Sequence, residues 1–182
     1  FLLDDLGVWP AVAAARAHPY RRMRVSDAAG GGELRFDADA LGHPELGHIV
    51  ENDLLVDRLW AACGQEPKLQ RVFPDRVAAI DQDDTGVTVQ LDSGQRLHAR
   101  LLLGADGATS RVRTLAGIDA PEHAYGQRGL VAYVGTQHPH EDTAWQRFLP
   151  TGPLAFLPCA DGRSPIVWTL PDADAQRLLD AP

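Results

Sequence analysis

The stretch between Leu101 and Arg113 restricts the possible folds of this chain more than any other feature. An apolar run of strand length, Leu101–Leu103, meets a glycine-rich turn that carries one carboxylate, Asp106. Glycines at 104 and 107 permit backbone conformations and close approaches that a side chain would forbid. Asp106 is therefore expected between a strand end and a helix start, where open α/β sheets bind cofactors. The alternative is ordinary turn chemistry between a strand and a helix.

The bulk composition indicates a globular chain and excludes several classes of partner. Of the 182 residues, 45% are hydrophobic and 23% are charged, as in ordinary folded domains. A formal net charge of −8 without a basic face argues against nucleic-acid binding. No apolar run approaches the ~20 residues that span a bilayer. Cys63 and Cys159 lack metal-ligand spacing, so reduced, buried thiols in a cytoplasmic protein are expected.

The first two thirds of the chain predict helices, a hairpin and a β-meander. Apolar spacing predicts a helix end, a turn and a second short helix over 1–17. Residues 22–27 and 33–36 flank a glycine-rich tip at 28–32, which is a hairpin signal. The segment 47–63 predicts a helix capped by Asn52 or Asp53. Strands are expected over 77–80, 87–91 and 96–103, separated by turns.

The last third of the chain predicts a β-sheet. Strands are expected over 129–136, 143–149, 154–158 and 165–170, and their short connections favour antiparallel pairing. Alternation places Ile166, Trp168 and Leu170 on one face of the last strand. Leu154 and Phe156 are expected to join them, with Trp145 or Phe148 depending on register. This aromatic face is either ordinary core or the wall of a pocket for a flat apolar substrate.

The segment His138-Pro139-His140-Glu141-Asp142 contains ligand types that bind metals. However, a proline separates the two histidines, and no partner cluster stands out elsewhere in the sequence. A solvated turn is therefore the preferred interpretation, and no metal site is predicted.

Two stretches resemble flavin-dependent aromatic hydroxylases of the para-hydroxybenzoate hydroxylase-like class. The pattern Asp-Gly-x-x-Ser-x-x-Arg after an apolar strand matches at Asp106, Gly107, Ser110 and Arg113. The stretch Trp145-Gln146-Arg147-Phe148-Leu149-Pro150-Thr151-Gly152-Pro153-Leu154-Ala155-Phe156-Leu157-Pro158 is similar to the ubiquinone-biosynthesis hydroxylase branch, as is the stretch 47–55.

The resemblance implies an enzyme that uses FAD, NAD(P)H and O₂ to hydroxylate a polyprenylated phenol in ubiquinone biosynthesis. It implies cofactor-binding roles for Asp106, Gly107, Asn52 and Arg113, although Asn52 is equally explained as a plain helix cap. The aromatic residues that could contact substrate are Trp145, Phe148, Phe156 and Trp168. No catalytic base is selected; the open candidates are His123, Tyr125 and Arg147. A related flavoprotein, such as a prenyl reductase or halogenase, and a non-catalytic β-rich ligand-binding module are the alternatives.

The expected fold class is α+β: part of an FAD-binding α/β fold plus an antiparallel substrate-binding sheet. The expected divisions are a helical segment (1–20), a substrate-side hairpin (21–46), part of the FAD-binding domain (47–117) and the sheet domain (118–182). The Gly-x-Gly-x-x-Gly turn that opens the family is absent, as is its later Gly-Asp segment, so we expect an internal fragment that is inactive and binds FAD weakly or not at all. Peripheral membrane contact and a complex with other quinone-biosynthesis enzymes are further expectations for the full-length protein.

Overall fold

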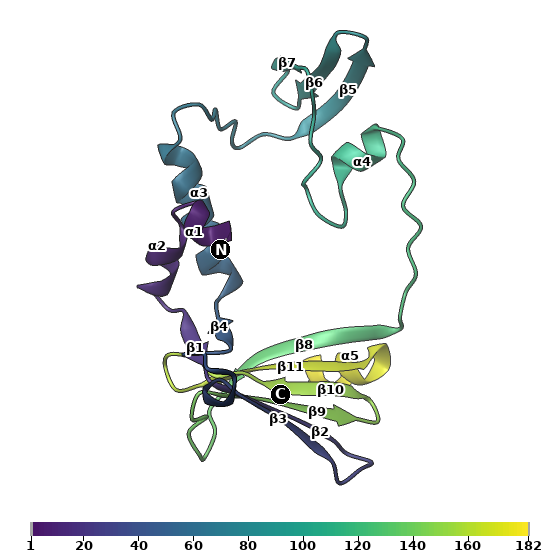
Figure 1. Ribbon diagram of the computed structural model, residues 1–182. Helices are drawn as coiled ribbons and strands as arrows, with labels where there is room; N and C mark the ends of the chain where they lie inside the picture. The colour runs from purple at the N-terminus through teal and green to yellow at the C-terminus, as the bar shows by residue number, and fades with distance from the viewer. Residues whose placement is uncertain (1, 182) are drawn as a thin grey trace. The chain divides into compact units, whose positions relative to one another are not determined.

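The computed structural model describes residues 2–181, which form two compact units. The first unit contains residues 2–67 and 124–181, and the second contains Lys68–His123 (Figure 1). The first unit thus joins the N-terminal helices to the strands of the last third of the chain, while the second is continuous in sequence. The helix that contains Asn52 therefore belongs to the same unit as the large sheet.

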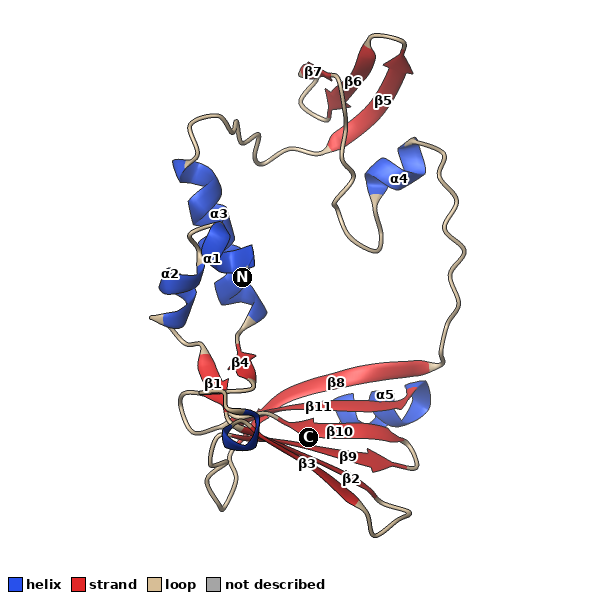
Figure 2. Ribbon diagram, in the orientation of Figure 1, coloured by secondary structure: helices blue, strands red, loops and turns tan. Residues whose placement is uncertain are grey.

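A six-stranded sheet dominates the first unit (Figure 2). Its order is β3 (Glu33–Asp37), β2 (Arg22–Asp27), β9 (Thr143–Leu149), β10 (Gly152–Phe156), β11 (Ser164–Pro171) and β8 (Gln127–Val134). The last four strands in this order pair antiparallel, as the short connections predicted. The hairpin β2–β3 also forms as predicted, but β2 joins β9 in parallel, so the complete sheet is mixed.

The register of this sheet separates the four aromatic residues singled out in the sequence. Phe156 lies opposite Trp145 on one side and opposite Ile166 on the other. Because paired residues share a face, Trp145, Phe156 and Trp168 lie on one face, as alternation allowed. Phe148 pairs with Pro153 and therefore lies on the opposite face.

Helix α5 (Asp172–Leu179) packs against β8 and β11 and covers one face, which we call the covered face. Arg128, which pairs with Leu170, donates hydrogen bonds to Asp172 (3.1 Å) and Gln176 (3.2 Å) of this helix. Leu170 is only 2% exposed. Under α5 the covered face is therefore core at Leu170, whereas Ile166 and Trp168 are only partly buried.

The opposite face, which we call the open face, carries large exposed apolar side chains. Its exposed members are Leu34, Phe36, Val131, Tyr133, Phe148 and Val167. Among the large apolar side chains of this sheet that are described as exposed, Trp145 alone lies on the covered face. Several exposed large apolar side chains on one face of a sheet are typical of an interaction surface.

The N-terminal region forms the predicted short helices, α1 (Leu2–Asp5) and α2 (Trp9–Ala13). After them, β1 (His18–Tyr20) pairs with β4 (Gly47–Ile49), and a short 3₁₀ helix, η1 (Asp39–Leu41), lies between them in sequence. The helix predicted within 47–63 begins one or two residues earlier than its expected cap implied and runs slightly further: α3 spans Asn52–Gln65. Its N-cap is Glu51 rather than Asn52 or Asp53, because Glu51 is the last residue with an extended backbone.

The second unit consists of the predicted meander followed by one short helix. The strands β5 (Val77–Asp83), β6 (Gly86–Leu91) and β7 (Arg96–Ala99) form an antiparallel sheet, and α4 (Arg111–Leu115) follows. Val87, Val89 and Leu91 form its core. The last strand was predicted to continue to Leu103 but ends at Ala99, because no described strand pairs with 101–103. Leu101 and Leu103 are consequently exposed.

We expect Gly86→Ala to destabilise the meander by about 2–3 kcal/mol. Gly86 has φ 151°, and an added Cβ would overlap the carbonyl oxygen of Ala99 across the β6–β7 pairing. Faster hydrogen exchange at the β6 and β7 amides would report the loss. Gly129→Ala is the control, because a Cβ added there would meet no atom within 4 Å and the φ of Gly129 is not positive. Equal effects of the two substitutions would contradict the steric explanation.

Candidate functional site

The turn after the apolar run is organised by Asp106, which binds the start of α4. One carboxylate oxygen accepts a short hydrogen bond from the Ser110 hydroxyl. The other accepts hydrogen bonds from the backbone N–H groups of Arg111 (2.7 Å) and Val112 (3.1 Å). The Ser110 Oγ in turn accepts the N–H of Arg113 at 3.0 Å. Asp106 and Ser110 together therefore accept the hydrogen bonds of the N–H groups at the start of α4. These are the groups that were expected to attract an external polar ligand.

These bonds stabilise the ionised form of Asp106. The hydrogen bond from Ser110 is the main cause that lowers the pKa of Asp106, followed by the backbone N–H groups of α4. Burial acts in the opposite direction but does not prevail, since Asp106 is exposed. The carboxylate therefore remains charged at neutral pH and keeps the turn in one conformation.

Positions 104 and 107 of the turn favour glycine for different structural reasons. Gly107 has φ 87°, which favours glycine. A Cβ at Gly104 would lie 3.0 Å from the Val112 side chain, so the chain passes closely over α4. Arg113 donates a hydrogen bond to the Ala108 carbonyl oxygen at 2.9 Å and closes the turn from the other side. The four residues of the Asp-Gly-x-x-Ser-x-x-Arg pattern thus shape the same turn.

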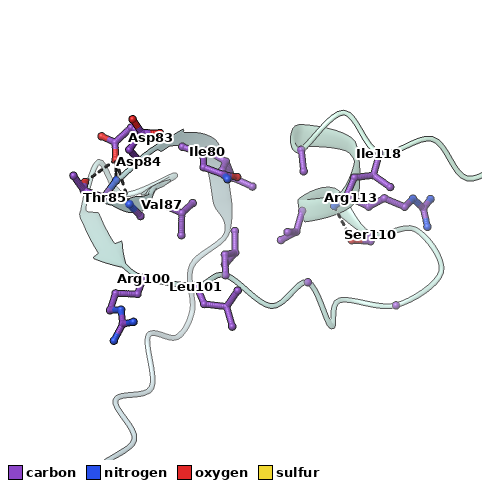
Figure 3. Close-up of a pocket in the computed structure, with 17 residues that line it drawn as sticks. Ile80, Asp83, Asp84, Thr85, Val87, Arg100, Leu101, Ser110, Arg113 and Ile118 are labelled. Carbon is purple, nitrogen blue, oxygen red and sulfur yellow. Dashed lines mark hydrogen bonds between the residues drawn. The ribbon is translucent and has the colours of Figure 1, made fainter.

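A cavity of about 670 Å³ lies within the second unit beside this turn (Figure 3). The end of β5 and the following turn to β6 line one part, and residues 100–118 line the rest. Two cations, Arg100 and Arg113, and two carboxylates, Asp83 and Asp84, contribute to the lining. The Asp83 carboxylate accepts hydrogen bonds from Thr85 and from the Gly86 N–H. The hydrogen bonds from Thr85 are the main cause that lowers the pKa of Asp83.

Asn52 is the first residue of α3 in the first unit. Its side chain is exposed and makes no hydrogen bond with any other residue between 2 and 181. Its amide is therefore available to donate and to accept hydrogen bonds.

A second cavity, of about 620 Å³, lies on the covered face of the sheet. Trp145, Arg147 and Phe156 line it, together with Thr136 and residues 138–140. The guanidinium of Arg24 lies 5.2 Å from the Trp145 ring centroid. Trp168 does not line this cavity, and its buried indole N–H has no hydrogen-bond partner among the described residues. Of the three candidate catalytic bases, Arg147 lines this cavity, whereas His123 and Tyr125 are exposed elsewhere in the chain.

The segment 138–142 is not a simple solvated turn, since the fold brings His18 to it. His140 donates from Nε2 to the Cys159 carbonyl oxygen (3.0 Å) when its Nδ1 accepts the Asp142 N–H (3.1 Å). His18 Nε2 contacts an Asp142 carboxylate oxygen at 2.9 Å. The ligand atoms of these three residues lie within 4.8 Å of one another. Both nitrogens of His140 are engaged in hydrogen bonds. The cluster is therefore explained as a hydrogen-bonded link between His18 of β1 and the segment 138–142.

Both cysteines are free thiols, as predicted, but only Cys159 is fully buried. No helix between residues 2 and 181 is long and apolar enough to cross a membrane.

Comparisons with known proteins identify the class of this chain. Its fold is that of FAD-dependent monooxygenases: Pseudomonas aeruginosa PqsL, described as a probable FAD-dependent monooxygenase, has a TM-score of 0.79 at 22% identity over 97% of this chain and 49% of that chain. Klebsiella pneumoniae R204Q HpxO complexed with FAD has a TM-score of 0.71 at 21% identity, over 97% of this chain and 49% of that one. Residues 2–177 match the family described as FAD binding domain, and the chain belongs to that family.

The sequence relatives are more specific. The chain is 40% identical to the 3-demethoxyubiquinol 3-hydroxylase of Escherichia coli (strain K12) over 92% of this chain and 42% of that protein. It is 37% identical to the mitochondrial ubiquinone biosynthesis monooxygenase COQ6 of Xenopus tropicalis, over 98% of this chain and 40% of that protein. The chain thus spans less than half the length of these relatives, and the resemblance noted in the sequence is confirmed.

Proposed function

We propose that the full-length protein containing this chain is an FAD-dependent monooxygenase that hydroxylates a polyprenylated phenol in ubiquinone biosynthesis, with NAD(P)H as reductant. The observation that carries this proposal is the similarity to ubiquinone-biosynthesis hydroxylases along almost the whole chain. Such substrates partition into bilayers, so the proposal includes contact with a membrane surface from the cytoplasmic side and a complex with other enzymes of the pathway.

The donor groups of this chain fit a flavin cofactor. Asn52 offers an unpaired amide at the start of α3. At Gly107 an added Cβ would meet no atom within 4 Å, so the backbone there is open to a close approach. Asp106 and Arg113 hold that turn in place, and the carboxylate retains one unused acceptor site beside its three hydrogen bonds. When bound, FAD supplies the activation of O₂. The residues named here bind and orient it.

The substrate is proposed to lie on the open face of the sheet. This face carries almost all of the exposed large apolar side chains of the sheet, whereas α5 covers part of the other face. Exposed apolar side chains can bind an aromatic ring and a prenyl chain by removing both from water. Phe148 is thus proposed to contact substrate. Trp145, Phe156 and Trp168 support the sheet from the covered face.

The class of activity is tested with the purified full-length protein. We expect it to retain FAD and to oxidise NAD(P)H faster when a prenylated phenol is added, with a hydroxylated product by mass spectrometry. Oxidation without hydroxylated product would favour a prenyl reductase, and a halogenated product in the presence of halide would favour a halogenase. A protein that binds apolar aromatics but no flavin would establish the non-catalytic module instead.

The position of the substrate is tested by two substitutions on the same strand, Phe148→Ala and Trp145→Ala. Both residues are about half exposed, but they lie on opposite faces of β9. Phe148→Ala should raise KM about tenfold, the effect of one aromatic contact, while Trp145→Ala changes it less than about twofold. The reverse result would place the substrate in the cavity of the covered face.

A further inference from the structure

The cavity on the covered face contains a buried hydroxyl for which the described chain supplies no partner. Ser164 is the first residue of β11, lines the cavity and is only 2% exposed. It lies two positions before Ile166 on the same strand, so its side chain points to the same, covered face. This side chain makes no hydrogen bond with any other residue between 2 and 181. Because buried hydroxyls usually have a partner, we expect this one to meet a polar group that enters the cavity.

An unpaired cation also lines this cavity. Arg147 of β9 makes no hydrogen bond or ion pair with any other described residue. By contrast, Arg24 of β2 and Arg35 of β3 both pair with Glu33. No aspartate or glutamate is among the described residues that line the cavity, although the chain has a formal net charge of −8. The cavity therefore offers a cation to an anion that these residues do not supply.

Two aromatic side chains separate the unpaired cation from the buried hydroxyl. Trp145 of β9, Phe156 of β10 and Ile166 of β11 form one row across the sheet, and the two aromatic residues line the cavity. Arg147 lies two residues after this row on β9, and Ser164 lies two residues before it on β11. Because β9 and β11 run in the same direction, the Cα atoms of these two polar residues are about 16 Å apart, from the usual strand spacing and rise. A ligand that meets both groups is therefore elongated.

We propose that this cavity is a second ligand site, which binds an elongated carboxylate with an apolar body and a hydrogen-bonding group at its far end. The carboxylate binds Arg147, the apolar body lies against Trp145 and Phe156, and the far group binds the Ser164 hydroxyl. The cavity volume of about 620 Å³ is in the range of small-molecule sites. The proposed phenol substrate lies on the open face, so the sheet separates the two ligands. This inference therefore goes beyond the proposed function and does not depend on it.

The test compares three matched ligands. Calorimetry measures the binding of 8-hydroxyoctanoate, octanoate and the methyl ester of 8-hydroxyoctanoate to the purified full-length protein. These ligands contain no aromatic ring, so they are not analogues of the proposed phenol substrate. The unmodified protein should bind 8-hydroxyoctanoate about fivefold more tightly than octanoate, the effect of one hydrogen bond. It should bind 8-hydroxyoctanoate about tenfold more tightly than the ester, the effect of one charged hydrogen bond.

Two substitutions then assign the contacts. S164A should bind 8-hydroxyoctanoate and octanoate equally, because the partner of the far hydroxyl is lost. R147Q should bind the acid and its ester equally, because the cation is lost. R35Q is the control, since it removes the same charge from the same face of the sheet but Arg35 does not line the cavity. R35Q should change each affinity less than about twofold.

Each outcome supports or overturns the inference. If the unmodified protein binds none of the three ligands, or if S164A and R147Q keep both preferences, the inference is wrong. Saturation with 8-hydroxyoctanoate should leave the KM for the prenylated phenol within about twofold. A KM that rises in proportion to the added acid would make this cavity the substrate site and overturn the inference. If the protein shows the expected preferences but contains no flavin, the inference stands although the proposed function fails.

Discussion

Replacing Asp106 by alanine in the full-length protein is expected to weaken FAD binding by about 30-fold, as the loss of a strong helix cap would. The substitution removes the acceptor of three hydrogen bonds, from the Ser110 hydroxyl and from two backbone N–H groups of α4. The turn at 104–110 then loses the group that fixes its path. We expect FAD to be largely lost during purification, and substrate-stimulated NAD(P)H oxidation to fall with it.

Asp106→Asn is the matched control, since the amide keeps one acceptor oxygen but has no charge. It should retain more FAD than Asp106→Ala, because part of the capping remains. If Asp106→Ala retained FAD normally, the turn would have no role in cofactor binding.

The two Asp106 variants also predict a pH dependence. The folded-state pKa of Asp106 is lowered, so its ionised form stabilises the protein above the unfolded value of about 3.9. That stabilisation is lost as the pH falls below this value and through the folded pKa. In acid unfolding followed by circular dichroism, both variants should lack this contribution, so their stability should depend less on pH there. A pH profile identical to that of the unmodified protein would contradict the lowered pKa.

The features that sequence predicted well are determined locally. The hairpin at 22–37, the meander at 77–99 and the turn at Asp106 each depend on neighbouring residues, through alternation, turn composition and glycine placement. The Asp-Gly-x-x-Ser-x-x-Arg pattern likewise identified residues that contact one another over six positions of sequence or fewer. What the pattern did not reveal is that Asp106 caps α4 itself.

The features that sequence missed depend on distant partners. The parallel pairing of β2 with β9 joins residues such as Met23 and Ala144, and no local pattern specifies it. The short strand Gly47–Ile49 exists because His18–Tyr20 lies beside it. The apolar run 101–103 shows the reverse case, since a strand needs a neighbour to pair with and the described chain supplies none. Alternation already places Phe148 and Trp145 on opposite faces of β9, but only the register shows that Trp145 is the one that shares a face with Phe156.

The distinction between the covered and the open face leads to the largest expected change in stability. Leu170→Ala should lower the free energy of unfolding by about 3 kcal/mol, because it deletes a buried side chain and leaves a cavity. Leu170 is 2% exposed on the face that α5 covers, and Ala175 of that helix is 1% exposed. Urea unfolding followed by circular dichroism measures the change.

Val167→Ala is the control for this prediction, since Val167 lies on the same strand but on the open face and is 38% exposed. Its loss should cost less than about 1 kcal/mol, because the removed methyl groups are partly in water. The functional effects should be reversed: Val167→Ala raises KM for the prenylated phenol, and Leu170→Ala leaves KM unchanged in the folded fraction. If both substitutions affected stability and KM alike, the sheet would not have separate structural and substrate-binding faces.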